Sequence, residues 1–393
     1  MMKIGFDVSQ TGASKAGCGF YAHALAQSLV AMAPAENYSF YPSFGDFFLD
    51  PAMPLENPYP ASHAHYGPHF KTLETAGAFW NEPDLEAKLH HPDIIHANNF
   101  WCPTHLKASR LVYTFYDMAF LEEPAWSTDA NRLGCFDGIF KAAVSADWIV
   151  AISEASRTHF LEVFPHFPKD RIRVIYPCSR FSDPARQGAR PNSLEPGLAQ
   201  KFWLSVGTIE PRKNQLGLAK AYARYREASA DPMPLVFAGG KGWLMDDFQR
   251  QLSELGISEH VILTGYVSDD ELIWLYRNCF ANLYPSFFEG FGLPVLEAMQ
   301  FGAPTLASNT TSIPEVLGTT GPLIGPLDEA GWIQAMLDLE NNPERRLIMR
   351  AAGEDQAAQF RWEVSTRQLL DLYAEVLDAP KRNLRVAGIL RNL

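Results

Sequence analysis

The stretch Phe287–Gln300, FFEGFGLPVLEAMQ, indicates both the fold class and the place of a binding site. It directly follows an apolar run, Cys279–Tyr284, that is typical of a buried strand. Gly290 and Gly292 leave backbone amides uncovered, and Pro294 suits the first turn of a helix. A strand, a glycine loop and a helix N-terminus in this order favour an anion such as a diphosphate, because the free N–H groups and the helix dipole attract negative charge.

Two carboxylates frame this element, Glu289 and Glu297, with seven residues between them. Glu297 stands about one turn into the predicted helix, where it can accept hydrogen bonds from paired ribose hydroxyls. Glu289 stands on the loop and is placed to meet a sugar. The alternative is a surface loop residue and a charge on a helix face, which the glycines and Pro294 make the weaker interpretation.

Outward from this stretch, short apolar runs alternate with segments of helical spacing. In the first half, strands are predicted over Lys3–Val8, Asp93–His96, Arg110–Phe115, Trp148–Ile152 and Arg171–Tyr176, and a first helix over Tyr21–Met32. In the second half, strands are predicted over Phe202–Val206, Pro234–Ala238, His260–Thr264, Cys279–Tyr284 and Pro304–Ala307. Helices there are predicted over Gly217–Glu227, Asp246–Leu255, Asp269–Arg277, Pro294–Gln300, Asp328–Leu339, Pro343–Gln359 and Val364–Leu377. This alternation predicts an α/β fold with parallel sheets covered on both faces.

The length of 393 residues favours two or three domains. The segment Ser182–Gly197 has no apolar period and is interpreted as a domain linker or a long exposed loop. We therefore predict an N-terminal domain over 1–181 and a C-terminal domain over 198–362. Residues 363–393 are expected to form a helix packing back on the N-terminal domain and a basic tail. The tail suggests a membrane-surface or partner contact, or simply a solvated terminus.

Composition excludes several classes of protein. A net charge of -12 argues against a nucleic-acid binder, which needs a concentrated basic face. The five cysteines are scattered, without a C-x-x-C pair, and so predict neither a disulfide framework nor a zinc site. No signal peptide and no apolar run of about 18 residues is visible, so we expect a cytoplasmic protein, with peripheral attachment to the inner face of the membrane as an option. The oligomeric state stays open.

The Glu289–Glu297 spacing resembles the E-x7-E signature of family 4 glycosyltransferases. Further matches follow in the family's order: the glycine loop at Gly17–Tyr21, AISEASR at Ala151–Arg157, RVIYP at Arg173–Pro177, VGTIEPRKN at Val206–Asn214, AGGKG at Ala238–Gly242, GYVSDDEL at Gly265–Leu272 and RWEVSTRQLLDLY at Arg361–Tyr373. The resemblance covers nearly the whole chain. It implies the GT-B fold, two facing Rossmann-like domains with a cleft between them. The VGTIEPRKN subgroup resembles bacterial mannosyltransferases of surface-polysaccharide synthesis.

The resemblance also implies a donor site. Arg212 and Lys213 follow a predicted strand, and cations there can neutralise the donor diphosphate as its bond to the sugar breaks. In the family, the turn equivalent to Tyr266 and Val267 touches the nucleotide base, although simple loop packing explains these two residues nearly as well. The remaining residues carried over for donor binding are Gly17, Gly19, Gly290, Phe291, Gly292 and Leu293.

On the acceptor side, Tyr116 and Asp117 follow a predicted strand. Many relatives have His-Asp here, so Tyr116 replaces a histidine that could exchange protons near neutrality. Asp117 is a candidate catalytic residue for the acceptor or donor sugar. Ser153 and Glu154 are expected to line the cleft, although Ser153 is equally a helix N-cap. The aromatic-rich segment Tyr38–Pro60 is expected to be a loop that helps to bind the acceptor.

The implied reaction is transfer of a hexose, with retention, from a nucleotide-sugar to a saccharide or lipid-linked saccharide in polysaccharide or lipopolysaccharide synthesis. A GDP-mannose-like donor is favoured. No D-x-D motif is present, so neither a metal nor another cofactor is expected. The alternatives are a GT-B-type nucleotide-sugar epimerase, a phosphorylase, or a catalytically inactive nucleotide-sugar sensor.

Overall fold

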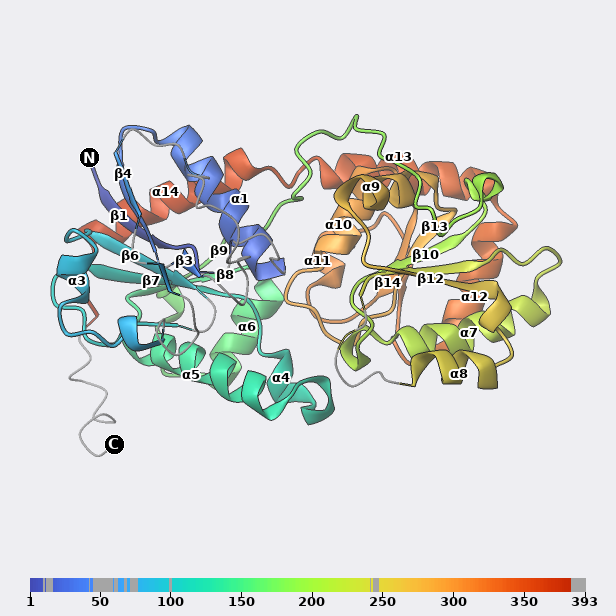
Figure 1. Ribbon diagram of the computed structural model, residues 1–393, viewed down its shortest axis with the longest axis horizontal. Helices are drawn as coiled ribbons and strands as arrows, with labels where there is room; N and C mark the ends of the chain where they lie inside the picture. Colours follow the sequence, from blue (N-terminus) through green and yellow to red (C-terminus); the bar gives the residue numbers. More distant parts are fainter. Residues whose placement is uncertain are drawn as a thin grey trace. The chain divides into compact units, whose positions relative to one another are not determined.

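The computed structural model describes residues 1–9, 11, 17–41, 43–44, 59, 63–66, 69–70, 77–98, 101–240, 242 and 247–382 (Figure 1). The chain divides into two compact units. Unit 1 comprises Met1–Met118, Asp129–Arg180 and Arg361–Leu393. Unit 2 comprises Ala119–Thr128 and Phe181–Phe360. Each unit is built around its own parallel sheet.

Unit 1 contains a seven-stranded sheet in the order β4-β2-β1-β6-β7-β8-β9. Its strands are β1 (Lys3–Asp7), β2 (Asn37–Tyr41), β4 (Ala64–Tyr66), β6 (Ile94–Asn98), β7 (Arg110–Phe115), β8 (Trp148–Ala151) and β9 (Ile172–Val174). All neighbouring strands pair in parallel. Every residue of the central strand β6 is buried, as expected for a parallel sheet covered on both faces. A separate two-stranded ribbon pairs β3 (Ser43–Phe44) with β5 (His69–Phe70).

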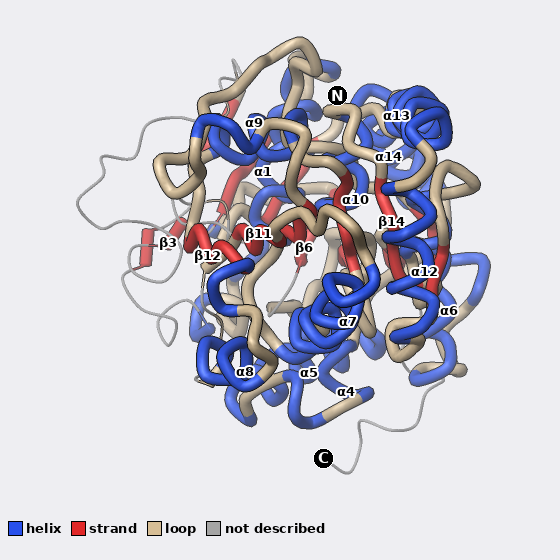
Figure 2. Tube along the Cα trace, turned by 90° about the vertical axis from the view of Figure 1, so that its right-hand side faces the viewer, coloured by secondary structure: helices blue, strands red, loops and turns tan. Residues whose placement is uncertain are grey.

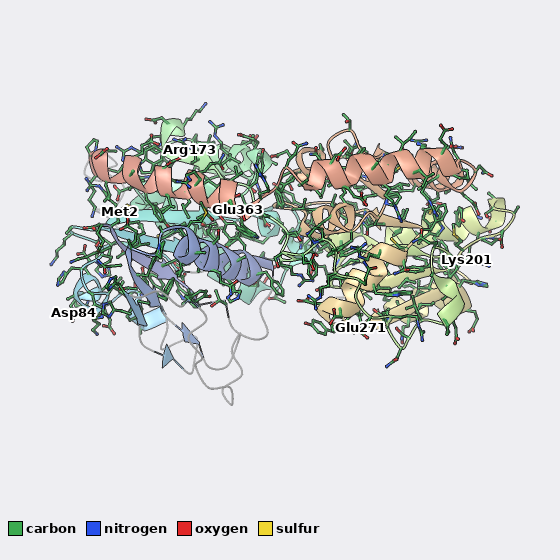
Figure 3. The ribbon with its side chains drawn as sticks, turned by 90° about the horizontal axis from the view of Figure 1, so that it is seen from above. Met2, Asp84, Arg173, Lys201, Glu271 and Glu363 are labelled. Atoms are coloured by element: carbon green, nitrogen blue, oxygen red, sulfur yellow. The ribbon has the colours of Figure 1, made fainter. Side chains whose placement is uncertain are left out.

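The larger helices of unit 1 are α1 (Gly17–Met32), α5 (Asp129–Ser145), α6 (Glu154–Val163) and the terminal α14 (Trp362–Asp378), with the single turn α3 (Leu85–Lys88). α14 lies alongside α1 (Figure 1). Its Tyr373 hydroxyl lies 2.6 Å from Nδ1 of His96 in the sheet, so this buried histidine is a structural residue. On the outer side, Arg173 pairs with Glu375 of α14 at 2.7 Å, and Figure 3 labels Arg173 beside this helix. The terminal helix is therefore an integral part of unit 1.

Unit 2 contains a six-stranded parallel sheet in the order β12-β11-β10-β13-β14-β15. Its strands are β10 (Trp203–Val206), β11 (Leu235–Ala238), β12 (Val261–Gly265), β13 (Ala281–Tyr284), β14 (Thr305–Ser308) and β15 (Leu323–Ile324). Its helices are α4 (Ala119–Glu122), α7 (Gln215–Ala228), α8 (Phe248–Glu254), α9 (Asp269–Asn278), α10 (Leu293–Gln300), α11 (Ile313–Leu317), α12 (Glu329–Glu340) and α13 (Pro343–Ala357). Figure 2 shows α7 and α8 on one side of the strands and α9 on the other. Each side buries its own apolar cluster against the sheet.

Each sheet has one point where the strand order reverses. In unit 1, β1 has β2 on one side and β6 on the other; in unit 2, β10 lies between β11 and β13. Open α/β sheets bind ligands outside the carboxyl ends of the strands at such a switch point. The residues that follow Val206 and Tyr284 in unit 2 are therefore candidates for ligand binding. In unit 1, the corresponding candidates follow Asp7 and Asn98.

The α/β fold class and all ten strands predicted by range are confirmed, with ends that move by one or two residues. The interpretation of Tyr38–Pro60 as an acceptor-binding loop is wrong at its start. Asn37–Tyr41 forms β2, which pairs with β1 and β4 inside the sheet. From Tyr38 on, its residues are all buried, so they show no inside–outside alternation that would reveal a strand. Apart from Ser43–Phe44 and Tyr59, the rest of that range lies outside the described residues.

Two segments join unit 2: one was predicted to be part of the N-terminal domain, and the other to be a linker or an exposed loop. Ala119–Thr128 lies within the range predicted for the N-terminal domain, yet it packs in unit 2. Ser182–Gly197 belongs to the same unit and runs along α9 as an exposed loop. There the amide of Ala189 donates to the carbonyl of Asp270 at 3.0 Å, and a Cβ on Gly188 would lie 2.3 Å from that carbonyl. Ser182–Gly197 is therefore anchored to α9 and does not separate the units as a free linker.

The described residues of the basic tail make hydrogen bonds within unit 1. The ammonium of Lys381 donates to the carbonyls of Leu106 and Ser109, both at 2.8 Å, and the amide of Arg382 donates to Asp147 at 2.6 Å. Lys381 and Arg382 are therefore held by hydrogen bonds within unit 1, whereas Arg385 and Arg391 lie outside the described residues. A membrane or partner contact of the tail stays a prediction. Within the described ranges, no helix combines the length and apolar character needed to cross a membrane.

Candidate active site

The residues predicted to bind the donor diphosphate meet at the switch point of unit 2. After β10, the chain forms the 3₁₀ turn η4 (Pro211–Lys213), which carries Arg212 and Lys213. After β13, it forms the loop that carries Glu289. The amide of Phe287 donates to the carbonyl of Arg212 at 2.9 Å and joins the two segments. Asn214 ends the turn in a left-handed conformation, and its side chain donates to the carbonyls of Pro285 at 3.2 Å and Pro326 at 2.8 Å.

Glu289 is the centre of an ion-pair cluster. Its Oε2 accepts from Nη1 of Arg212 at 3.0 Å, and its Oε1 accepts from Nζ of Lys213 at 2.7 Å and from the Tyr284 hydroxyl at 2.9 Å. The Glu289 side chain is only 8% exposed. Burial alone would raise the pKa of Glu289, but Arg212 and Lys213 outweigh it and hold this pKa at about 2. Glu289 is therefore ionised at neutral pH and fixes both cations.

Sequence reasoning missed two members of this cluster. Glu210 is buried and accepts from Nη2 of Arg212 at 2.7 Å, so two carboxylates balance the two cations. Tyr284 is buried at the end of β13, and its hydroxyl also accepts from Lys213 at 2.7 Å. Burial and the neighbouring Glu289 raise the pKa of Tyr284 well above its ordinary value, so it acts as a neutral hydrogen-bond partner. The only sequence signal was position: Glu210 stands two residues before Arg212, and Tyr284 ends a predicted strand.

The glycine loop leads directly into α10, whose N-cap follows Glu289 by three residues. Gly292 is the N-cap of α10 with a φ of 104°, and a Cβ there would lie 2.6 Å from Cδ1 of Ile313. Only glycine meets both conditions without strain. The Ser312 hydroxyl lies 2.9 Å from the carbonyl oxygens of both Glu289 and Phe291 and donates to either one, and the Thr311 hydroxyl accepts from the Glu289 amide at 3.0 Å. Thr311 and Ser312, which directly precede α11, therefore hold the loop in place, and no sequence motif marks either residue.

Glu297 lies in α10 and is buried at 3% exposure. The hydroxyl of Tyr276 donates to its Oε2 at 3.4 Å. Glu289 thus has two cationic partners, and Glu297 accepts from a phenol hydroxyl. Tyr266, which follows β12, is 86% exposed, whereas Val267 packs against the apolar cluster of α9.

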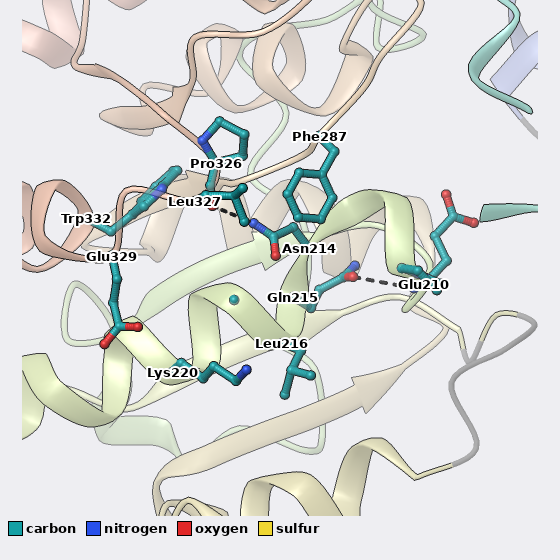
Figure 4. A pocket seen from close by; sticks show the side chains of 12 residues that line it. Glu210, Asn214, Gln215, Leu216, Lys220, Phe287, Pro326, Leu327, Glu329 and Trp332 are labelled. Carbon is teal, nitrogen blue, oxygen red and sulfur yellow. Dashed lines mark hydrogen bonds between the residues drawn. The ribbon is translucent and has the colours of Figure 1, made fainter. Parts of the chain in front are cut away.

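A hollow of about 410 Å³ opens beside the cluster on unit 2 (Figure 4). Glu210 and Phe287 line it together with residues of α7 and α12, among them Lys220 and Trp332. The wall nearest the cluster is held by Gln215, whose side chain accepts from the Glu210 amide at 3.4 Å. The same turn therefore shapes both this hollow and the ion-pair cluster.

The acceptor-side candidates lie in unit 1, as do Gly17 and Gly19 of the donor-binding candidates, whereas the cluster lies in unit 2. Gly17 and Gly19 begin α1. Tyr116 donates its hydroxyl hydrogen bond to Cys18 O at 3.3 Å or to Asn98 at 3.4 Å. Burial raises the pKa of Tyr116 well above its ordinary value, so its hydroxyl is neutral at neutral pH.

The remaining acceptor-side candidates differ in their surroundings. Asp117 is half-buried next to Tyr116. Ser153 is fully buried and caps α6 by accepting from the Ser156 amide at 2.9 Å, so its helix-cap interpretation is the one that the contacts support. Glu154 pairs with Arg157 at 3.1 Å. The roles of Asp117 and Glu154 toward a substrate stay predictions.

At the switch point of unit 1, Asp7 ends β1 and Asn98 ends β6. The Asn98 side chain donates to the backbone carbonyl of Asp7 at 2.9 Å, and the Ser9 amide donates to the Asp7 carboxylate at 2.9 Å. Burial raises the pKa of Asp7 to about 7, although its hydrogen bonds from Ser9 and Asn98 act in the opposite direction. Among the described residues, no group of three or more histidine, cysteine, aspartate or glutamate side chains has the geometry to hold a metal ion.

Comparison with known proteins agrees with this geometry. Residues 16–178 match Glycosyltransferase Family 4, and residues 189–356 match Glycosyl transferases group 1. The O-antigen chain mannosyltransferase B of Escherichia coli is 32% identical over 95% of this chain and 99% of its own length. A serotype-specific mannosyltransferase, WbdA of Escherichia coli, is 32% identical over 60% of this chain but only 29% of its own length.

Among solved structures, Anabaena HepE in complex with UDP and glucose has the same fold, with a TM-score of 0.68 at 18% identity over 95% of this chain and 100% of that one. The fold is therefore GT-B, and the resemblance seen in the sequence is confirmed. The chain is an enzyme that belongs to the group 1 glycosyltransferases, with a family 4 N-terminal region, and it resembles bacterial mannosyltransferases.

Proposed function

We propose that this glycosyltransferase moves a hexose, with retention, from a nucleotide-sugar to a saccharide or lipid-linked saccharide in polysaccharide or lipopolysaccharide synthesis. GDP-mannose is the favoured donor, because a relative that matches over 99% of its own length is an O-antigen chain mannosyltransferase. The observation that carries the proposal is the cluster of Arg212, Lys213 and Glu289 at the switch point, next to the N-terminus of α10.

The cluster suits a departing diphosphate. An ammonium has three donors, and among the described residues Tyr284 and Glu289 accept from two of those of Lys213, so we assign the third to a phosphate oxygen. The Lys213 side chain is 12% exposed, so a phosphate that it contacts is largely shielded from water. Charge interactions are stronger in such a site than in bulk water. Lys213 can thus bind the diphosphate while the cluster keeps its geometry.

In the proposed reaction, the bond between the anomeric carbon and the phosphate oxygen breaks, and its electron pair leaves with the nucleoside diphosphate. Lys213, Arg212 and the amides at the start of α10 stabilise that growing charge. The acceptor hydroxyl forms the new bond on the same face of the sugar, and its proton passes to the departing phosphate oxygen. Glu289 is held between two cations, so we assign it to the positioning of those cations and of the sugar rather than to nucleophilic attack.

The test is a panel of GDP-, UDP- and dTDP-linked sugars, assayed with and without a mannose-terminated oligosaccharide. We expect nucleoside diphosphate release from GDP-mannose that depends on the acceptor, and a product with the anomeric configuration of the donor. Conversion of the donor sugar without transfer would indicate an epimerase, and release driven by inorganic phosphate a phosphorylase. Binding of nucleotide-sugar without turnover of any donor would indicate a sensor.

Glu297→Ala should weaken nucleotide binding more than it lowers turnover. The lost ribose hydrogen bonds are worth about 1–3 kcal/mol, which corresponds to roughly 5- to 150-fold in the Kd of GDP. Calorimetric titration of GDP measures this effect, with Glu344→Ala on the exposed face of α13 as the matched control. Equal GDP affinity in wild type and Glu297→Ala would remove Glu297 from the ribose site.

Transfer should not need a divalent metal or another cofactor. The expectation follows from the missing D-x-D motif and from the two cations that Glu289 holds in place. Turnover of GDP-mannose should stay unchanged after EDTA treatment and dialysis. A loss of turnover that manganese or magnesium specifically restores would contradict this expectation.

A further inference from the structure

A short segment, Ala119–Thr128, leaves the sequence of unit 1 and belongs to unit 2. It forms α4 and then the 3₁₀ turn η1 (Pro124–Trp126). Glu123 caps this turn by accepting from the Ala125 amide at 3.1 Å, and Pro124 occupies its first turn. The Trp126 amide donates to the Glu123 carbonyl at 3.0 Å. The backbone that carries Trp126 is therefore well defined.

Trp126 packs on the loop of the ion-pair cluster. Its ring stacks on Phe287 with centroids 5.9 Å apart and an interplanar angle of 10°, and it tilts against Phe288 at 6.5 Å and 52°. Both phenylalanines are half-buried and directly precede Glu289. Stacked aromatic rings at these distances restrain one another beyond the effect of buried area.

The backbone of these two phenylalanines holds Arg212. The Phe287 amide donates to the Arg212 carbonyl at 2.9 Å, and the Phe288 carbonyl accepts from Nη1 of Arg212 at 2.7 Å. The same Nη1 donates to Glu289 at 3.0 Å. A shift of Phe287 and Phe288 would therefore move Arg212 and Glu289 together, and with them the position of Lys213.

We propose that Trp126 is a positioning residue of the donor site, which acts through Phe287 and Phe288 on the cluster of Arg212, Lys213 and Glu289. The proposal rests on the proposed function, since it assigns Trp126 to the donor site of that reaction. Groups that stabilise a transition state must be held to within a fraction of an ångström. Trp126 restrains the loop although it lies far from Arg212, Lys213 and Glu289 in the sequence.

The test compares Trp126→Ala, Trp126→Phe and Trp274→Ala in the full-length protein. Trp274 is the matched control, because it stacks on Phe202 of the same unit with centroids 6.3 Å apart and an angle of 7°. Trp126→Ala should lower kcat for GDP-mannose by roughly 10- to 100-fold, with a smaller change in donor KM. Trp126→Phe keeps a stacking ring and should regain most of that loss. Trp274→Ala should lower the melting temperature but leave kcat close to wild type.

A double variant tests the route of the effect. If Trp126 acts through Phe287, the kcat of Trp126→Ala with Phe287→Leu should be no lower than that of Phe287→Leu alone. Additive losses, or a kcat for Trp126→Ala within twofold of an active wild type, would overturn the proposal. Equal losses of kcat in Trp126→Ala and Trp274→Ala would also overturn it, because they would reflect stability alone.

Failure of the proposed function is distinguishable from failure of this inference. If wild type turns over no sugar nucleotide, the proposed function is wrong. The role of Trp126 is then tested by the affinity for GDP and UDP, measured by titration. A weaker nucleotide affinity in Trp126→Ala, recovered in Trp126→Phe, would then support the positioning role. Unchanged affinity in both variants would overturn it.

Discussion

Lys213→Ala is expected to lower kcat by roughly 10²–10³, the usual loss when one preorganised partner of a developing charge is removed. Charge on the diphosphate grows as its bond to the sugar lengthens, so Lys213 should bind the transition state more tightly than the ground state. Donor KM should therefore rise much less than kcat falls. Steady-state kinetics with the preferred sugar nucleotide measure both constants.

Lys220→Ala is the matched control for this prediction. Lys220 is an exposed lysine in α7 on the rim of the adjacent hollow, and it has no contact with Glu289 among those described (Figure 4). Its removal should leave kcat unchanged. If Lys213→Ala instead keeps kcat and only raises KM, Lys213 contributes uniform binding, and its proposed catalytic role is wrong.

Glu289→Gln is expected to have the largest effect on stability in this site. The side chains of Arg212 and Lys213 are 21% and 12% exposed, and the substitution leaves their charges without their central carboxylate. Breaking a buried ion pair by removing one partner typically costs about 3–5 kcal/mol. Turnover should fall as well, because the two cations lose their common anchor. Denaturant unfolding and kcat, measured on the same preparation, report both effects.

The pH dependence separates the charge of Glu289 from its packing. The folded-state pKa of Glu289, about 2, lies below its ordinary value of 4.5, so its ionised form stabilises the fold at higher pH. That contribution is fully present above about pH 5 and is lost as the pH falls from about 4.5 to about 2. The difference in unfolding free energy between wild type and Glu289→Gln should shrink over this window. A difference that stays constant down to pH 2 would mean that packing, and not charge, accounts for it.

The sequence predicted the parts of the site that depend on local chemistry. Gly290 and Gly292 predicted the loop and helix start, since only glycine tolerates the backbone of Gly292. Arg212 and Lys213 follow a predicted strand, and Glu289 stands on the predicted glycine loop. Their direct contact was not predictable, because residues more than 70 positions apart meet only once the sheet has formed.

What the sequence could not predict depends on tertiary structure. Thr311 and Ser312 hold the loop through hydrogen bonds that no short motif encodes. Ala119–Thr128 is part of unit 2, where Trp126 packs on Phe287, more than 150 positions away in the sequence. The sequence did not predict β2, because a strand that is buried on both faces lacks the alternation of apolar and polar residues that marks a half-exposed strand.

The most direct test of the proposed reaction is mass-spectrometric detection of transfer from GDP-mannose to a mannose-terminated oligosaccharide. Wild type is expected to add one hexose to the acceptor and to release GDP in equal amount, whereas Lys213→Ala at the same concentration gives a product peak reduced by roughly 10²–10³. An acceptor of unchanged mass with every sugar nucleotide in the panel, from a wild-type protein that is folded by thermal melt, would contradict the assignment of hexosyl transfer to this site.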